Sequence, residues 1–401
     1  MIKKIRGIIE YLAVLFVILD CYSVISIIGS NGNYVKIIAI LLMILAMLLG
    51  INKHVSFPQK LFMFAVVYLT LQFVFSIFNQ GISTMQYWFN QILIFLVLYV
   101  YLWKESRKST FLEMFRNIMF LICVASLVFY VFGTVLNIIP HSSYIYANWG
   151  SMSSYKNYYY LYEESQGTWF FGKALIRNIG IFAEGPMFAY CICIALWYEM
   201  FESQISKIRL ITFILAVCTA FSVTGFIFIG VLLLFKCLQI RSKNFLKMTT
   251  KQIALLLMLF LGLLASVYLF LDKLDSVSGV SRTSQYLNAL RIWKENLFIG
   301  VGYKMSNEGG FASGILLALV ECGILGSLVY LIPIIGTIIK SIRRRDYAYV
   351  ALSIGYAEIL MLTAVPYKIV TLCVASLLWI YLLEGRKDNV EIPSMLRNVR
   401  L

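Results

Sequence analysis

Long apolar runs alternate with short polar stretches along most of this chain. Runs long enough to cross about 30 Å of hydrocarbon as a helix lie at residues 8–28, 34–51, 61–78, 87–103, 114–139, 187–201, 253–271, 347–364 and 367–384. The first run is longer than the apolar part of a secretory signal, and no small-residue cleavage site follows it. We therefore expect it to remain as a spanning helix, and the whole pattern predicts an all-α, polytopic membrane protein.

Two further apolar stretches, 210–238 and 311–339, each fit more than one arrangement. If 210–238 were one span, the basic segment 241–251 would lie on the side opposite to the amino terminus, against the positive-inside rule. We therefore predict a hairpin that turns at "SVTG" (222–225) and one long or broken span over 311–339. This arrangement gives about twelve spans with both termini in the cytoplasm.

Composition and charge support this interpretation. The chain has 401 residues, of which 61% are hydrophobic and 13% charged, and a mean hydropathy of +0.84, values outside the range of soluble domains. No polar stretch is long enough for a second domain, so we expect a single membrane domain over 1–401. The net charge of +15 follows from basic residues on the cytoplasmic side rather than from a nucleic-acid-binding surface. The eight cysteines lack the loop pairing that disulfides or zinc sites require.

Two large loops, 140–186 and 272–310, are expected outside the cell, and a short tail, 385–401, in the cytoplasm. The first loop is rich in aromatic residues, whose flat rings stack on the apolar faces of sugars but also favour the membrane interface. Both interpretations of the rings remain open. We include the following loop residues in a candidate substrate-binding set: Tyr158, Tyr159, Tyr160, Trp169 and Lys173.

The first loop ends in "RNIGIFAEGP", which places Arg177 and Glu184 at the entry to the apolar run 187–201. A guanidinium is always charged, and its planar set of donors suits a diphosphate group such as a polyprenyl carrier presents at this depth. Arg177 could equally be a structural arginine that reaches the interface or pairs with Glu184. Spacing alone does not decide between these roles.

The second loop contains "RTSQYLNALRIWKEN", which predicts an amphipathic helix lying on the membrane surface. Arg282 and Arg291 would lie on opposite sides of this helix, so we expect one of them to be structural. "GVGYK" follows, and its Gly300 and Gly302 permit close backbone approach, with Lys304 beside them. A dinucleotide site is rejected because no strand precedes this motif. The acidic residues of both loops show no pattern of a metal site.

Three acidic residues, Asp20, Glu321 and Glu358, fall within predicted spans. Charges at this depth are costly and usually line the interior of a bundle or a cavity. They could form a proton path in a transporter, or they could be paired structural groups.

Two motifs resemble those of the O-antigen polymerase and ligase superfamily. "RNIGIFAEGPMFA" (177–189) is similar to that family's Arg-x-x-Gly-x-Phe-x-Glu-Pro entry to a spanning helix, with Gly185 inserted before Pro186. "GVGYKMSNEGGFASGILLALVECGILGSLVYL" (300–331) is similar to its second motif, a Gly-x-Gly turn followed by a helix that ends in Glu-x-Gly-Ile-x-Gly. The order of elements matches over most of the chain.

The resemblance implies a membrane glycosyltransferase fold of the C type (GT-C), with a dozen spans in the bacterial cytoplasmic membrane and the active site on its outer face. It implies transfer of glycans from polyprenyl-diphosphate carriers, without metal or other cofactor. Carried over by motif, Arg177 is the first-loop arginine, Arg282 or Arg291 is the second-loop arginine, and Glu184 and Glu321 are the glutamates of the two motifs. The partners implied are a polyprenyl-diphosphate-linked oligosaccharide, membrane lipid, a chain-length regulator and a flippase, with no nucleic acid.

Ligases of this superfamily commonly carry a His-Asn pair after the Gly-x-Gly turn, where this chain has "SNEGG" (306–310). This difference favours a repeat-unit polymerase of the Wzy type, which joins units of O-antigen or capsule by an inverting transfer. Two alternatives remain. A ligase-like transferase would differ in its acceptor, and a lipid-linked oligosaccharide flippase would be expected to show paired halves, whereas no internal repeat is visible.

Overall fold

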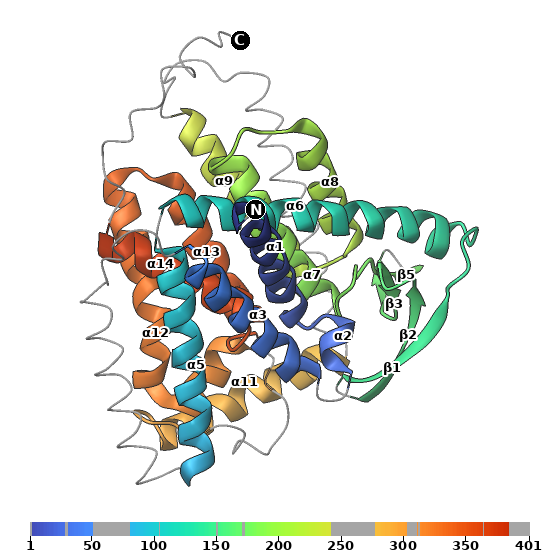
Figure 1. Ribbon diagram of the computed structural model, residues 1–401. Helices are drawn as coiled ribbons and strands as arrows, with labels where there is room; N and C mark the ends of the chain where they lie inside the picture. Colours follow the sequence, from blue (N-terminus) through green and yellow to red (C-terminus); the bar gives the residue numbers. More distant parts are fainter. Residues whose placement is uncertain are drawn as a thin grey trace.

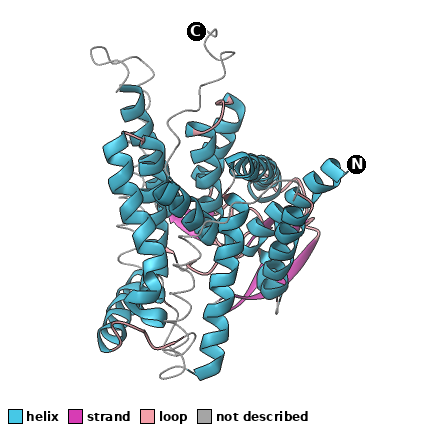
Figure 2. Cartoon of the chain, turned by 60° about the vertical axis from the view of Figure 1, so that its left-hand side comes forward, coloured by secondary structure: helices cyan, strands magenta, loops and turns pink. Residues whose placement is uncertain are grey.

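The computed structural model describes residues 2–28, 31–50, 81–103, 105–149, 151–170, 173–241, 277–302, 311, 313–363 and 365–384. The predicted spans 61–78 and 253–271 and the tail 385–401 lie outside the described residues. The described chain is mostly helical, as Figure 2 shows in cyan. Its longer helices are α1 (Ile2–Asp20), α3 (Asn31–Leu48), α5 (Gly81–Leu102), α6 (Glu105–Phe129), α7 (Gly185–Phe201), α8 (Lys207–Thr219), α9 (Val223–Arg241), α11 (Val277–Glu295), α12 (Gly314–Arg344), α13 (Tyr347–Leu362) and α14 (Ile369–Glu384).

Several helices match the dimensions of a membrane. Four of those described are long and apolar enough to cross one, namely Asn31–Leu48, Arg107–Val135, Val223–Ile240 and Gly314–Arg344. Shorter apolar helices cover Asn90–Leu102, Gly185–Phe201, Tyr347–Leu362 and Ile369–Leu383. These lengths confirm a helical membrane protein, because a helix needs about 20 apolar residues to cross the hydrocarbon. The number of twelve spans and the GT-C architecture remain predictions.

Helix α7 lies at the centre of the described bundle. Every residue from Met187 to Met200 is buried, and the helix packs against α6, α8, α9 and α13. The indole nitrogen of Trp197 donates a hydrogen bond to the carbonyl of Ala348 over 2.8 Å. A helix that is apolar all round is surrounded by other helices or by lipid, and here the neighbours are helices.

The predicted break within residues 210–238 is confirmed, but the turn lies at 220–222 rather than at 222–225, because residues 223–225 already belong to α9. Helix α8 ends at Thr219 and α9 begins at Val223. Phe221 between them has a φ of 45°, which an α-helix does not permit. Figure 1 shows α8 and α9 as separate helices.

The prediction of a long or broken span over 311–339 is also confirmed. Helix α12 runs from Gly314 to Arg344, but Gly323 inside it has φ 62° and ψ −170°. This conformation is essentially open to glycine alone, so α12 is one long element with a kink at Gly323.

Two predicted boundaries are corrected. The first apolar run does not continue as one helix to residue 28, because α1 ends at Asp20, Tyr22 takes a φ of 55°, and Ser23 begins the short helix α2 (Val24–Ile27). The run 114–139 belongs to α6, which continues as a π-helical segment, η1 (Tyr130–Val135).

The first loop is a folded unit rather than a simple connection, and it adds short strands to a mostly helical chain. It contains β1 (Ser143–Trp149), β2 (Ser151–Tyr158) and β3 (Tyr162–Glu164) in one antiparallel sheet, and β4 (Gly167–Phe170) and β5 (Lys173–Ile176) in another. Tyr144 and Tyr146 are exposed, whereas Ile145 and Ala147 are buried. This alternation is the period of a strand with one buried face. Figure 1 shows the strands together on one side of the helices.

Candidate functional site

Arg177 directly follows strand β5. Its backbone N–H donates to the carbonyl of Gln166 over 2.8 Å, which extends the β4–β5 pairing by one residue. Its guanidinium Nη2 donates to Thr168 Oγ1 over 3.0 Å. Because Thr168 lies on β4, the hairpin positions both the backbone and the charged group of Arg177.

The next residue, Asn178, anchors the segment to the helices. It is fully buried, its Nδ2 donates to Thr219 Oγ1 over 3.1 Å, and its backbone N–H donates to the carbonyl of Thr219 over 3.0 Å. Its Oδ1 accepts from the N–H of Gly180 over 3.1 Å. A buried side-chain amide stays favourable only when it is bonded in this way. No local pattern in the sequence identifies Asn178, because its partner Thr219 lies far away in the chain.

The rest of the segment is held by the connection between α1 and α2. The N–H of Val24 donates to the carbonyl of Ile181 over 2.9 Å, and the N–H of Ala183 donates to the carbonyl of Tyr22 over 2.8 Å. The segment that carries the first family resemblance is thus held by α8 on one side and by the α1–α2 connection on the other. Such support from rigid elements is what a positioned functional group requires.

Glu184 occupies the N-cap position of α7 in an extended conformation, with proline in the first turn, where its missing N–H costs nothing. A Cβ on Gly185 would lie 2.8 Å from the carbonyl oxygen of Ala220, so the first turn packs directly on the α8–α9 turn. The same Cβ position on Gly185 would lie 3.7 Å from the Cδ of Arg177. Arg177 and Glu184 therefore both border the first turn of α7, where the free N–H groups and the helix dipole favour an anion.

The aromatic candidates divide between core and surface. Tyr158 is 3% exposed, and a Cβ on Gly133 would lie 2.7 Å from its ring, so Tyr158 packs inside the folded loop. Tyr159 and Tyr160 are exposed and form the turn between β2 and β3, with φ of 57° and 60°. Of the three, only these two can reach a ligand in solution. Trp169 and Lys173 lie on β4 and β5, opposite Ala174 and Phe170 respectively.

A hydrogen-bonded carboxylate, Glu164, stabilises the folded loop. Its Oε1 accepts from Lys156 Nζ over 2.5 Å, and its Oε2 accepts from Thr134 Oγ1 over 2.7 Å and from the Tyr158 hydroxyl over 3.3 Å. The bond to Glu164 raises the pKa of Lys156. These contacts join the sheet to the π-helical end of α6, so the group has a structural role.

The neighbouring Glu163 is in a different situation. It is 2% exposed, and its Oε2 is buried without a hydrogen-bond partner in the described structure. Its backbone N–H donates to the carbonyl of Gly180 over 2.7 Å, so it lies against the segment that carries Arg177. Burial raises the pKa of Glu163 from 4.5 to about 8, because a low-dielectric environment disfavours the ionised form.

In the second loop, the predicted helix is confirmed as α11, and its position on the membrane surface remains a prediction. Arg291 is exposed, and its Nη2 donates to Asn288 Oδ1 over 2.9 Å. The helix packs on α12 through a small core that includes Ala289 and Val320. Figure 1 shows α11 at the lower end of the helices and β5, which precedes Arg177, at their side. Arg282 lies on the same helix, and its side chain is outside the described residues, as are Lys304, Asp275 and Glu308.

The two glycines of "GVGYK" pack against the kink of α12. Gly300 and Gly302 are buried with φ of 77° and 96°, and a Cβ on Gly300 would lie 2.6 Å from the backbone nitrogen of Gly323. The N–H of Gly302 donates to the carbonyl of Glu321 over 3.0 Å. The two parts of the second motif therefore interlock through backbone contacts, which only glycine allows at these positions.

Of the three acidic residues in predicted spans, two are bonded. Asp20 Oδ2 accepts from the N–H of Ile369 over 2.7 Å, and Glu321 Oε2 accepts from the Tyr367 hydroxyl over 2.7 Å. Both carboxylate oxygens of Glu358 are buried without a partner in the part of the chain that the structure describes. Glu321 therefore fits the structural interpretation and Glu358 does not, whereas Asp20 is bonded through only one of its two oxygens.

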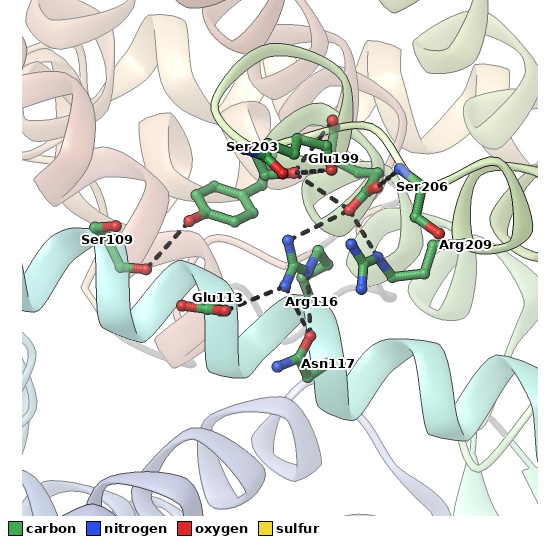
Figure 3. A network of polar contacts seen from close by, with 10 residues as sticks. Ser109, Glu113, Arg116, Asn117, Glu199, Ser203, Ser206 and Arg209 are labelled. Atoms are coloured by element: carbon green, nitrogen blue, oxygen red, sulfur yellow. Dashed lines mark hydrogen bonds and ion pairs between the residues drawn. The ribbon is translucent and has the colours of Figure 1, made fainter. Parts of the chain in front are cut away.

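A further buried charge network joins α6, α7 and α8 (Figure 3). Glu199 is fully buried; its Oε2 accepts from Arg209 Nε over 3.0 Å and lies 3.4 Å from Arg116 Nη1. Its Oε1 accepts from the N–H of Ser206 over 2.5 Å. Because both oxygens of Glu199 are bonded, this network is structural rather than a binding site.

Among the described residues, no group of three or more His, Cys, Asp or Glu side chains could hold a metal ion. Comparisons with family models, with curated proteins and with solved structures found no match. The arrangement around Arg177 is therefore interpreted from its own chemistry: a fixed guanidinium beside a helix N-terminus and a carboxylate, at the entry to a buried apolar helix.

Proposed function

We propose that the chain is a polymerase of a cell-surface polysaccharide, O-antigen or capsule, that joins polyprenyl-diphosphate-linked oligosaccharide repeat units. The observation that carries this proposal is the position of Arg177. Its guanidinium is held by Thr168 beside the first turn of α7, where a diphosphate anion would be stabilised by a fixed cation and by free N–H groups. The two motifs quoted above support the same function.

In the proposed reaction, a terminal hydroxyl of one lipid-linked unit attacks the anomeric carbon of another. A new C–O bond forms as the bond to the diphosphate breaks, and the electron pair leaves with the polyprenyl diphosphate. Arg177 stabilises the charge that develops on this leaving group, an effect that is strongest in a preorganised site of low dielectric. Direct attack inverts the anomeric centre. This supply of positive charge from the protein makes the proposed reaction independent of a metal ion.

The proton of the attacking hydroxyl needs an acceptor, and Glu184 is our candidate. It stands at the N-cap of α7, whose first turn Arg177 also borders, and a carboxylate within hydrogen-bond reach of the hydroxyl would act as a general base. Asp275 and Glu308 of the second loop are alternatives. Arg291 or Arg282 would contribute the second cation when the two loops meet on the substrate. The exposed Tyr159 and Tyr160 would stack on the glycan.

The same proposal assigns the chain to the bacterial cytoplasmic membrane with both termini inside. The folded first loop and α11 would then lie on the outer face, where lipid-linked units are presented. A chain-length regulator and a flippase are the proposed protein partners. No other cofactor is needed for this chemistry.

The test uses the purified protein in lipid with its host's polyprenyl-diphosphate repeat unit and EDTA. We expect a ladder of added units from the wild type and a loss of about 10²–10³-fold in kcat for Arg177→Ala, the usual effect of removing one preorganised donor. Thr168→Val removes only the bond that orients Arg177, so we expect a loss of about tenfold in kcat, equivalent to one hydrogen bond. Arg291→Ala tests the second cation in the same assay.

A matched control is Arg209→Ala, which removes an arginine of the structural network of Figure 3. Folded Arg209→Ala protein should keep kcat near that of the wild type. Failure of the folded wild type to extend a bound repeat unit would refute the polymerase proposal. Transfer of a finished glycan to another acceptor would then indicate a ligase, and movement of the lipid across a vesicle membrane would indicate a flippase.

A further inference from the structure

A cavity of about 640 Å³ lies between α3, α5, the end of α1 and the residues that precede α14. Its volume is within the range of small-molecule sites in proteins. Arg177 and Glu184 do not line it, so it is separate from the site described above. The charged and amide residues that line it are Asp20, Asn33, Lys36, Asn90, Gln91 and Lys368.

The cavity has hydrogen-bond donors held in place by the fold. Lys36 Nζ donates to the carbonyl of Tyr367 over 2.9 Å, which leaves two of its three N–H groups for another acceptor. Lys368 Nζ lies 3.6 Å from the centre of the Tyr22 ring, within the range of a cation–π contact. Both ammonium groups are therefore fixed at the wall of the cavity by contacts with other elements.

The cavity also has acceptors without donors. Asp20 Oδ2 accepts from Ile369, but Asp20 Oδ1 is buried with no hydrogen-bond partner in the described structure, and the same holds for Gln91 Oε1. Asp20 is 0% and Gln91 6% exposed. Buried polar atoms in native proteins are almost always bonded, so each such exception points to a missing ligand or water.

This combination identifies the chemistry of the ligand. A phosphate offers only acceptors, and its charge would lie against the carboxylate of Asp20. A sugar hydroxyl is both donor and acceptor, so it can donate to Asp20 Oδ1 or Gln91 Oε1 while it accepts from Lys36 Nζ. A polyhydroxylated ligand satisfies both sets of groups, whereas an anion satisfies one.

The outer part of the cavity is apolar and exposed. Ile37, Leu41 and Leu93 line it and are 54%, 59% and 48% exposed. Ile37 and Leu41 lie on α3, which is long and apolar enough to span a membrane. A glycan attached to a lipid would place its sugar among the polar groups and its hydrocarbon along this apolar rim.

We propose that this cavity binds a sugar residue of a glycan, through Asp20, Gln91 and Lys36. The identification of that glycan as a lipid-linked repeat unit rests on the proposed function. The cavity would then hold one of the two glycans that the polymerase brings together.

The test measures binding to the purified full chain in detergent by isothermal titration calorimetry. One probe is the oligosaccharide fragments released by mild acid from the surface polysaccharide of the host cell. The other is farnesyl diphosphate, which has a lipid and a diphosphate but no sugar. We expect Gln91→Leu and Lys36→Met each to weaken binding of the fragments about tenfold or more and to leave binding of farnesyl diphosphate unchanged.

Lys340→Met is the matched control, because Lys340 Nζ also donates to backbone carbonyls, those of Tyr381 and Leu382, and does not line the cavity. It should leave both affinities unchanged. Size-exclusion chromatography checks the folding of each variant independently of binding. If Lys36→Met does not fold, Gln91→Leu alone is used for the test. Fragments that do not bind, or bind both variants as tightly as the wild type, would overturn the proposal. So would weakened binding of farnesyl diphosphate alone.

The two proposals fail in different ways. If Gln91→Leu weakens binding of the fragments but the wild type does not extend a repeat unit, the polymerase proposal is refuted and the sugar site stands. Extension by a protein whose binding is insensitive to Gln91→Leu would refute the sugar site alone.

Discussion

Arg177 shows how a single residue obtains its role from its surroundings. The β4–β5 hairpin supplies the Thr168 contact, and Asn178 next to it holds the segment to α8. An exposed arginine loses side-chain entropy when it binds an anion. One that is already oriented loses less, which is the physical advantage of the bond to Thr168.

Glu163 yields a pH-dependent prediction at the same scale. The folded carboxyl, with a pKa of about 8, keeps its proton to a higher pH than the unfolded one, whose ordinary value is 4.5. The folded state therefore binds more protons between these values, and stability falls as the pH rises through this window. We expect a loss on the order of a few kcal/mol, absent in Glu163→Gln, measured by thermal unfolding in detergent at pH 5, 7 and 9. An equal slope in both proteins would contradict this assignment.

Glu199 yields a second prediction, because its removal takes the buried carboxylate away from Arg116. Arg116 is 5% exposed and keeps only the exposed Glu113 as a carboxylate partner in Glu199→Ala. We expect a loss of about 3–5 kcal/mol in the free energy of unfolding. Glu113→Ala is the control, since the Glu113 side chain is 56% exposed, and its loss should cost less than about 1 kcal/mol. Equal losses of stability in Glu199→Ala and Glu113→Ala, measured by thermal unfolding, would show that burial of the carboxylate does not determine the loss.

At the scale of elements, the kink of α12 joins two parts of the second motif. The N–H of Ile324 donates to the carbonyl of Leu297 over 2.9 Å, and the N–H of Val301 donates to the carbonyl of Val320 over 2.8 Å. A regular helix would use these groups for its own bonds. The break therefore releases backbone groups of α12, and the segment that follows α11 pairs with them.

Gly323 is the residue on which this arrangement depends. A Cβ at this position would lie 2.3 Å from the backbone of Phe298, at a φ of 62°. We expect Gly323→Ala to cost about 3 kcal/mol or more, from strain and overpacking together. In the control Gly336→Ala, the added Cβ meets only the end of the flexible Leu382 side chain. Thermal unfolding of Gly323→Ala within about 1 kcal/mol of that control would show that the kink can move.

At the scale of the whole molecule, the described helices and the folded loop make a topological prediction. We expect the loop that carries Tyr160 on the outer face and the "RRR" segment that ends at Arg345 on the inner face, by the positive-inside rule. Single cysteines are introduced at Tyr160 and Arg345 in a chain whose accessible Cys218 and Cys237 are serine. A membrane-impermeable maleimide should label position 160 in intact cells and position 345 only after permeabilisation. The reverse pattern would invert the proposed topology.

The sequence by itself determined the helical membrane class and the break between α8 and α9, and it predicted a span over 311–339 that could be either continuous or broken. These features depend on the length of an apolar run and on local charge or glycine placement, which can be read over a few turns of chain. The helical character of α11 was accessible for the same reason. The alternation in "SYIYANW" was also present in the sequence, but the density of aromatic and polar residues led to an expectation of a loop.

Only the tertiary structure decided how the sites are built. Asn178 acts through Thr219, Lys36 through Tyr367, and Asp20 through Ile369. These contacts join residues that are far apart in the chain, so no local period or spacing encodes them. Burial of Glu163 and of the acceptors of the cavity likewise follows from packing between separate elements. Local composition therefore predicts where helices form, whereas long-range packing decides which polar groups meet and which are left for a ligand.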